Sequence, residues 1–187
     1  MHRTKVHVLA APEAMEQVGE VRGDDVYAIL NTAAKAYQYV ICDCGTYYDE
    51  GVAMALTAAD HVVLLTSPDV TSVRDSFRRL KMLQAVGIDK ERVRLVVNKW
   101  NRATSFVSLD DIAENLGIPV AKTIAADTRS VDQALNEGKM LREVNRKSDV
   151  ARDLAGLVGM LTDDDEVSDP DDEPSTGLAG FFRKIMG

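Results

Sequence analysis

The chain has 187 residues, of which 45% are hydrophobic and 28% charged, enough for one sizeable core and too few for two. Its formal net charge of -8 argues against a general nucleic-acid binder, which would carry a basic excess. No run approaches the ~18 apolar residues of a membrane-spanning helix, and the first residues lack the apolar run of a secretory signal, so a cytoplasmic protein is expected.

Short β-rich apolar runs alternate with helical patterns along the chain, which predicts a layered α/β domain with a mainly parallel sheet. We expect five strands, at residues 5–10, 39–43, 61–66, 93–98 and 119–124. The second, third and fourth are nearly continuous in apolar residues, as in strands covered on both faces. These three are therefore expected to be central.

Helices are expected where apolar residues recur every three or four positions. With their capping residues they cover 24–37, 70–87, 108–117, 130–138 and 148–161. Ser108 is expected to cap its helix, and Ser72 with Asp75 resembles a capping box with Asp in place of the usual Glu. Gly87, Gly117 and Gly138 are expected to end their helices.

The composition changes after the domain predicted at residues 1–161. Residues 162–176 contain eight acids and no base, and are expected to form a disordered acidic linker because they have too few apolar side chains to offset their ordering entropy. Residues 177–187 are predicted to form an amphipathic, membrane-targeting helix. Its apolar, membrane-binding face would consist of Leu178, Phe181, Phe182, Ile185 and Met186. The alternative is that this segment docks on its own domain or in a partner's groove.

Two polar residues at the ends of predicted strands could belong to a nucleotide site. Asp43 ends the run YVICD, a position from which a carboxylate can handle Mg²⁺; the alternative is an acid that caps the next turn. Asn98 ends VRLVVN, and there the alternative is an Asx turn. No segment of the sequence reads G-x-x-x-x-G-K-[ST], the loop that holds nucleotide phosphates.

The order of four segments resembles the MinD/ParA family of deviant Walker ATPases, including its pilus-assembly branch called CpaE or TadZ. The segments are YVICDCG, HVVLLTSPDVTSVRD, VRLVVNKWNR and LGIPVAKTIAADTRSVDQALNEG, within a resemblance that covers about residues 5–161. It implies a three-layer P-loop NTPase-like fold that is incomplete at the N-terminus. It also implies that Asp43 is the Walker B-like catalytic acid that binds Mg²⁺ through water, and that Asn98 contacts the adenine base. The family usually has Ile-Pro-x-Asp at the base pocket, where this chain reads IAAD at 124–127.

The resemblance implies a positioning or pilus-assembly factor bound peripherally to the inner face of the cytoplasmic membrane, with protein partners from such a system and dimer formation. ATP and Mg²⁺ are expected to bind only if a phosphate loop is supplied from elsewhere, and the chain alone is not expected to hydrolyse ATP. Two alternatives stay open, a non-enzymatic scaffold that binds protein partners and a ParA-like DNA-partition protein. Nucleic acid is the less favoured partner, since the predicted domain is nearly neutral and its basic clusters lack interleaved aromatic residues.

Overall fold

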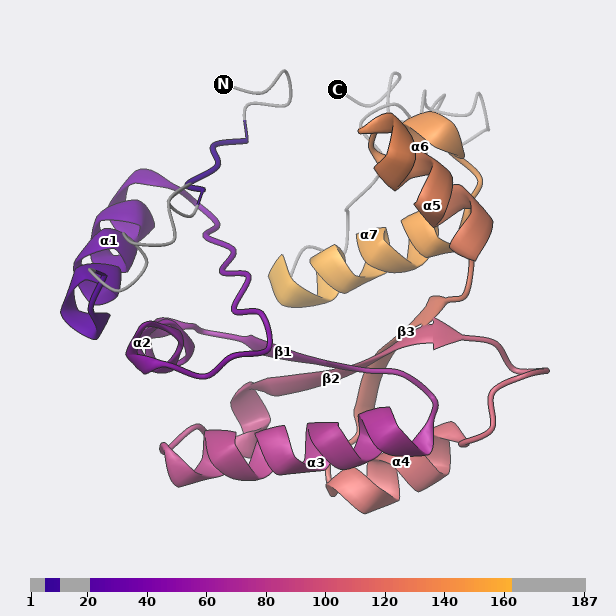
Figure 1. Ribbon diagram of the computed structural model, residues 1–187, viewed down its shortest axis with the longest axis horizontal. Helices are drawn as coiled ribbons and strands as arrows, with labels where there is room; N and C mark the ends of the chain where they lie inside the picture. Colours follow the sequence, from indigo (N-terminus) through magenta and orange to yellow (C-terminus); the bar gives the residue numbers. More distant parts are fainter. Residues whose placement is uncertain (1–5, 11–20, 163–187) are drawn as a thin grey trace, which may run out of the picture. The chain divides into compact units, whose positions relative to one another are not determined.

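The computed structural model describes residues 6–10 and 21–162 (Figure 1). The acidic linker, apart from its first residue, and the whole amphipathic helix fall outside these residues, including Leu178, Phe181, Phe182, Ile185 and Met186. The chain divides into two compact units. One comprises residues up to Val62 together with Met82–Arg92, and the other comprises Val63–Lys81 together with the residues from Val93 onward.

The larger unit is built around a three-stranded sheet of order β1-β2-β3. The strands are β1 (Val62–Thr66), β2 (Val93–Trp100) and β3 (Val120–Ala125). β2 and β3 run parallel, with Leu95 opposite Val120 and Val96 opposite Lys122. The helices are α3 (Val70–Ala85), α4 (Leu109–Leu116), α5 (Thr128–Glu137), α6 (Leu141–Val144) and α7 (Asp149–Thr162).

Helices cover both faces of this sheet, with α3 and α4 on one side and α5, α6 and α7 on the other (Figure 1). On the α7 side, Val96 and Ile124 pack with Val150 in a buried cluster. Because side chains alternate along a strand, Leu95 and Val97 point to the opposite face, and both are fully buried. The described residues therefore form the predicted three-layer α/β fold with a parallel sheet.

The smaller unit contains α1 (Gly23–Ala36), an extended stretch, α2 (Glu50–Ala58) and the 3₁₀ turn η2 (Lys90–Arg92). The two α-helices approach closely through glycines: a Cβ atom on Gly23 would lie 3.2 Å from Met54 Cγ, and one on Gly51 would lie 3.2 Å from Val26 Cγ2. Arg92 donates from Nη2 to the carbonyl groups at the end of α2, Leu56, Thr57 and Ala59. Its guanidinium thus satisfies acceptors that have no partner inside the helix.

Two of the five predicted strands do not form in the described residues. Residues 6–10 and 39–43 have no strand assignment, and Ile41 in the second run is 94% exposed. A strand exists only when a neighbour accepts and donates its backbone hydrogen bonds, whatever its own side chains favour. The apolar run 39–43 has the composition of a buried strand but no neighbouring strand among the described residues of the smaller unit.

The prediction that residues 61–66 form a central strand is also wrong for the described residues. β1 ends the strand order, and its side chains alternate between buried and exposed, with Val63 36% and Leu65 56% exposed. Among the strands that the structure describes, only β2 has a neighbour on each side. A continuous apolar run reveals that a strand is suited to burial, but it does not reveal how many neighbours it has.

The helix predictions are confirmed for all five segments, whereas the short helices α2 and α6 were not predicted. Ser108 caps α4 by accepting from the Asp111 amide, and Gly117 and Gly138 end α4 and α5 with φ values of +64° and +59°. The prediction of a capping box formed by Ser72 and Asp75 is wrong. Ser72 instead donates from both its amide (2.9 Å) and its hydroxyl (2.7 Å) to Asp69, which directly precedes α3. Among the described helices, none has the length and apolar character needed to cross a membrane.

Replacing Asp69 by alanine is expected to lower the free energy of unfolding by about 1 kcal/mol, because the first turn of α3 loses the acceptor for the Ser72 amide. Thr71→Ala changes the same turn without removing that acceptor, and is expected to stay within about 0.5 kcal/mol of the wild type. Urea unfolding at neutral pH measures both variants.

The loss of stability in the Asp69→Ala variant is expected to depend on pH. The backbone N–H of Ser72, and next its hydroxyl, lower the pKa of the Asp69 carboxyl below its ordinary value of 3.8. A lowered folded-state pKa stabilises the fold above the ordinary value, and this stabilisation is lost as the pH falls through the folded-state value. The deficit of the alanine variant should therefore shrink in unfolding measured below about pH 4. A deficit of the same size in acid would contradict an ionised cap.

Candidate functional site

A small polar cavity lies where β1 and β2 end in the larger unit. Its volume is about 200 Å³, and it is lined by Leu65, Thr66, Ser67, Ser72, Asp75, Ser76, Arg79 and Asn98. The first three come from the end of β1, the next four from α3 and the last from β2. The carboxyl ends of two adjacent strands therefore meet at one edge of the sheet, the usual place for a ligand in an open α/β sheet.

Asn98 is half-buried in this wall, and the backbone beside it is strained. Lys99, the next residue, has φ +56° without being glycine, and the pairing of β2 with β3 is irregular between Val97 and Trp100. Asn98 Oδ1 accepts from the Lys99 amide at 2.8 Å. An Asx turn would place this bond two residues on, so the observed contact is a different local one. A strained backbone at a strand end is a feature that clusters at functional sites.

The cavity wall offers groups that both donate and accept hydrogen bonds. The hydroxyl groups of Thr66 and Ser76 belong to buried residues, and Thr66 Oγ1 donates to the Ser67 carbonyl at 3.4 Å. The carboxamide of Asn98 has two donor hydrogens, and its oxygen has a second lone pair beyond the bond to Lys99. Drug-sized ligands usually occupy roughly 300–1,000 Å³, so this cavity suits one polar ring rather than a whole nucleotide.

Asp43 belongs to the smaller unit and lies in the extended stretch before α2. It is exposed, and its Oδ1 accepts from the Gly45 amide at a long 3.4 Å, with Gly45 at φ +57°. This contact is the local turn that was the alternative to a Mg²⁺ role. Asp43 and Asn98 belong to different units, and each is described within its own unit.

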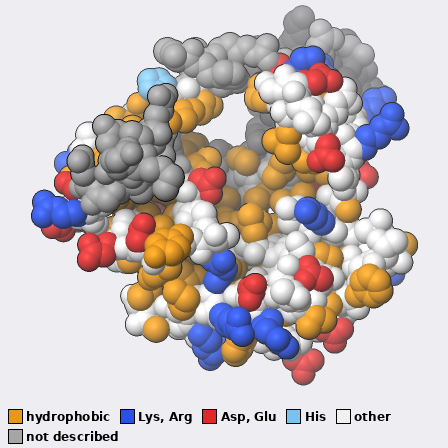
Figure 2. All heavy atoms as spheres, viewed as in Figure 1, with side chains coloured by type: hydrophobic (Ala, Val, Ile, Leu, Met, Phe, Trp, Pro, Cys, Tyr) orange, Lys and Arg blue, Asp and Glu red, His pale blue; other side chains and the backbone are white. Residues whose placement is uncertain are grey.

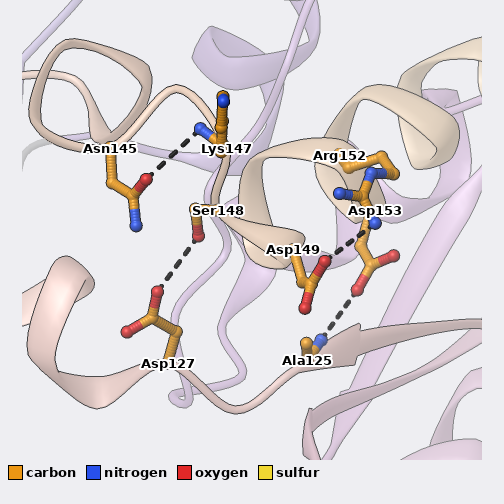
Figure 3. A network of polar contacts seen from close by, with 8 residues as sticks. All are labelled: Ala125, Asp127, Asn145, Lys147, Ser148, Asp149, Arg152 and Asp153. Carbon is orange, nitrogen blue, oxygen red and sulfur yellow. Dashed lines mark hydrogen bonds and ion pairs between the residues drawn. The ribbon is translucent and has the colours of Figure 1, made fainter.

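The IAAD segment at 124–127 ends β3 and begins α5. Asp127 caps α5, with Oδ1 accepting from the Ser130 amide at 3.0 Å, and its Oδ2 accepts from the Ser148 hydroxyl at 3.2 Å (Figure 3). The backbone N–H of Ser130 is the main reason why the pKa of the Asp127 carboxyl is lowered. The carboxylate is thus occupied in joining α5 to the start of α7.

A second contact of this network holds α7 on the sheet. Asp153 Oδ2 accepts from the amide of Ala125, the last residue of β3, at 2.9 Å (Figure 3). In the loop between α6 and α7, Asn145 donates from Nδ2 to the Ser130 hydroxyl at 3.1 Å. Both contacts fix the loop that follows β3, so any ligand at this edge of the sheet would meet a rigid wall.

The hydroxyl and carboxamide groups of the cavity wall suit hydrogen bonds to a polar ligand. Within residues 6–10 and 21–162, no group of three or more His, Cys, Asp or Glu side chains could hold a metal ion. Mg²⁺ needs only one or two protein carboxylates when phosphates and water supply its other oxygens, and Asp43 could be such a ligand. The fit of Mg²⁺ therefore depends on phosphate groups held near Asp43.

Sequence reasoning found Asn98 but missed the groups opposite it. Ser72, Ser76 and Arg79 are spaced i, i+4 and i+7 along α3, a polar stripe that faces the cavity. The apolar positions of the same helix predict only which face packs on the core. Polar residues at helical spacing, in the helix that follows the predicted strand 61–66, are the signal that could have indicated this side of the cavity.

No model of a known protein family matches the chain. A MinD septum site-determining protein of Nephroselmis olivacea is 27% identical over 191 residues, which cover 95% of this chain and 65% of that protein. The septum site-determining protein MinD of Escherichia coli K12 is 24% identical over 193 residues, which cover 97% of this chain and 69% of that protein. The chain thus spans about two thirds of the length of these relatives.

Solved structures with the same fold are MinD and ParA ATPases. A ParA family ATPase from Chlorobium tepidum matches with a TM-score of 0.73 and 23% identity, over 79% of this chain and 61% of that one. A MinC:MinD cell division protein complex from Aquifex aeolicus matches with a TM-score of 0.59 and 22% identity, over 73% of this chain and 60% of that one. The chain is thus similar in sequence to MinD proteins and shares the fold of solved MinD and ParA proteins.

Proposed function

We propose that the chain is a membrane-associated positioning or assembly factor of the CpaE/TadZ kind whose cavity at Asn98 receives the adenine base of ATP. The observation that carries this proposal is the half-buried Asn98 carboxamide in a polar cavity at the strand ends of a MinD/ParA fold. A carboxamide can donate to one ring nitrogen of adenine and accept from its amino group at the same time. The hydroxyl groups of Thr66 and Ser76 close the other side of the ring.

In this proposal Asp43 supplies the carboxylate on the Mg²⁺ side, where the cation would neutralise phosphate charge. The sequence contains no G-x-x-x-x-G-K-[ST] loop, so the phosphates would be held by a segment supplied from elsewhere. Asp43 is exposed and makes one long local hydrogen bond, which leaves its second oxygen accessible for a water-mediated contact.

Membrane association is assigned to residues 177–187. On a helix, the apolar residues Leu178, Phe181 and Phe182 share a face with Ile185 and Met186, while Arg183 and Lys184 lie beside it. Such a segment lies in the membrane interface and binds reversibly, and it binds more tightly when two copies act together in a dimer. A protein partner is also proposed, because one protein of the same fold was solved as a MinC:MinD complex.

Replacing Asn98 by alanine is expected to weaken adenine binding roughly tenfold or more, since a bidentate contact contributes about 1–3 kcal/mol and each 1.4 kcal/mol is tenfold. The measurement is isothermal titration of the full chain with adenosine and with Mg-ATP, and inosine serves as a ligand that lacks the amino group. Asn31→Ala, an exposed substitution on α1 of the other unit, is the matched control and should not change affinity. Equal affinities for adenosine and inosine, or no binding at millimolar concentrations, would contradict the base site.

Deleting residues 177–187 is expected to abolish co-sedimentation with vesicles of phosphatidylglycerol and phosphatidylethanolamine. The double variant F181S/F182S should lose most of the same binding, because burying each Phe contributes about 1.5–3 kcal/mol. R183Q/K184Q keeps the apolar face and should lose only the part of the binding that salt also removes. Vesicle binding that survives the deletion would overturn the membrane assignment.

A further inference from the structure

An apolar groove lies between α3 and α4 of the larger unit, away from the cavity at Asn98. Its volume is about 340 Å³, and its lining consists of Val70, Val73, Arg74, Phe77, Val107 and Asn115. We call it the α3–α4 groove. Its apolar residues come from α3 and from the loop that leads into α4.

This groove exposes more apolar surface than the protein needs for its own packing. Val70 is 66% and Phe77 41% exposed, and Phe106, next to the groove residue Val107, is 97% exposed. A single exposed apolar side chain needs no explanation, but several gathered along a groove indicate an interaction site.

The α3 side of the groove is basic. On α3, Arg74 lines the groove, and Lys81 Nζ lies 5.4 Å from the centre of the Phe77 ring. Figure 2 shows Lys and Arg side chains gathered over α3. A ligand that fits would therefore be apolar where it fills the groove and acidic where it meets the bases of α3.

We propose that residues 177–187 of the same chain dock in the α3–α4 groove when no membrane is present. Leu178, Phe181 and Phe182 would fill the groove between the two helices. The acidic run that precedes them, residues 163–173, would lie along the bases of α3. The acidic run and the apolar residues after it thus match the basic side and the apolar lining of the groove.

The chain is long enough for this contact. Residues 163–176, 14 in number, separate Thr162 at the end of α7 from Gly177. Extended at about 3.3–3.6 Å per residue, they span up to roughly 50 Å, more than the ~30 Å diameter of a small domain. The acidic run therefore acts as both tether and docking partner, and it raises the local concentration of the apolar segment at the groove.

Docking would hide the residues to which membrane binding is assigned. Only this consequence depends on the proposed function, because the docking itself is a contact within one chain. A vesicle surface would compete with the groove for Phe181 and Phe182, so association with a membrane would begin with release of the segment.

Hydrogen–deuterium exchange of the full chain, without vesicles, tests the docking. Backbone amides of residues 177–187 should exchange at least tenfold more slowly than in a free peptide of the same sequence. Phe77→Ser and Arg74→Glu are expected to return exchange to the free-peptide rate, because they remove the apolar floor and a basic side of the groove. Leu135→Ser, a change of an exposed apolar residue on α5 outside the groove, is the control and should keep the protection.

Free exchange of residues 177–187 in the wild type would overturn the docking. Protection that disappears on dilution would also overturn it, since it would indicate a second copy of the chain in the groove. Vesicle co-sedimentation of the same variants separates this inference from the membrane assignment. Phe77→Ser should raise the bound fraction several-fold while Leu135→Ser leaves it unchanged. Protection with no vesicle binding by any variant would support the docking and refute the membrane assignment.

Discussion

The burial of β2 is the constraint on which the larger unit depends. β2 has a neighbouring strand on each side, and Leu95, Val96 and Val97 are fully buried between helices on both faces. Its backbone groups are satisfied by β1 and β3, and its side chains complete two core layers, so the strand has little freedom to shift. Asn98 follows these three residues directly, so its carboxamide is positioned by the core.

The two candidate residues differ because only one of them has such support. Asn98 is held by a paired strand, a local bond to Lys99 and the polar stripe of α3 opposite. Asp43 ends an apolar run that pairs with no strand among the described residues, and it is exposed. Preorganised groups bind a ligand at low cost in entropy. In the proposed site the base side is therefore preorganised in this chain, and the phosphate side would depend on a further segment.

The α3 helix connects the two binding proposals. Its polar residues Ser72, Ser76 and Arg79 face the cavity at Asn98. Apolar residues and Arg74 on another side of the helix form one side of the α3–α4 groove. A ligand in the cavity and a segment in the groove would therefore contact opposite sides of one helix. Coupling between them needs a difference in α3 between bound and free states, which is the physical requirement for any effect of nucleotide on membrane release.

The sequence by itself determined the local features of this protein. The positions of five helices, the Ser108 cap, the glycine ends at Gly117 and Gly138, and the candidate Asn98 all follow from spacing and side-chain chemistry within a few residues. Only the tertiary structure decided that, among the described residues, β1 lies at the end of the sheet and 39–43 forms no strand, and that α3 supplies part of the cavity wall. The physical reason is that backbone partners far along the chain decide whether a segment forms a strand and where it lies in the sheet. The pattern of its own side chains does not specify these partners.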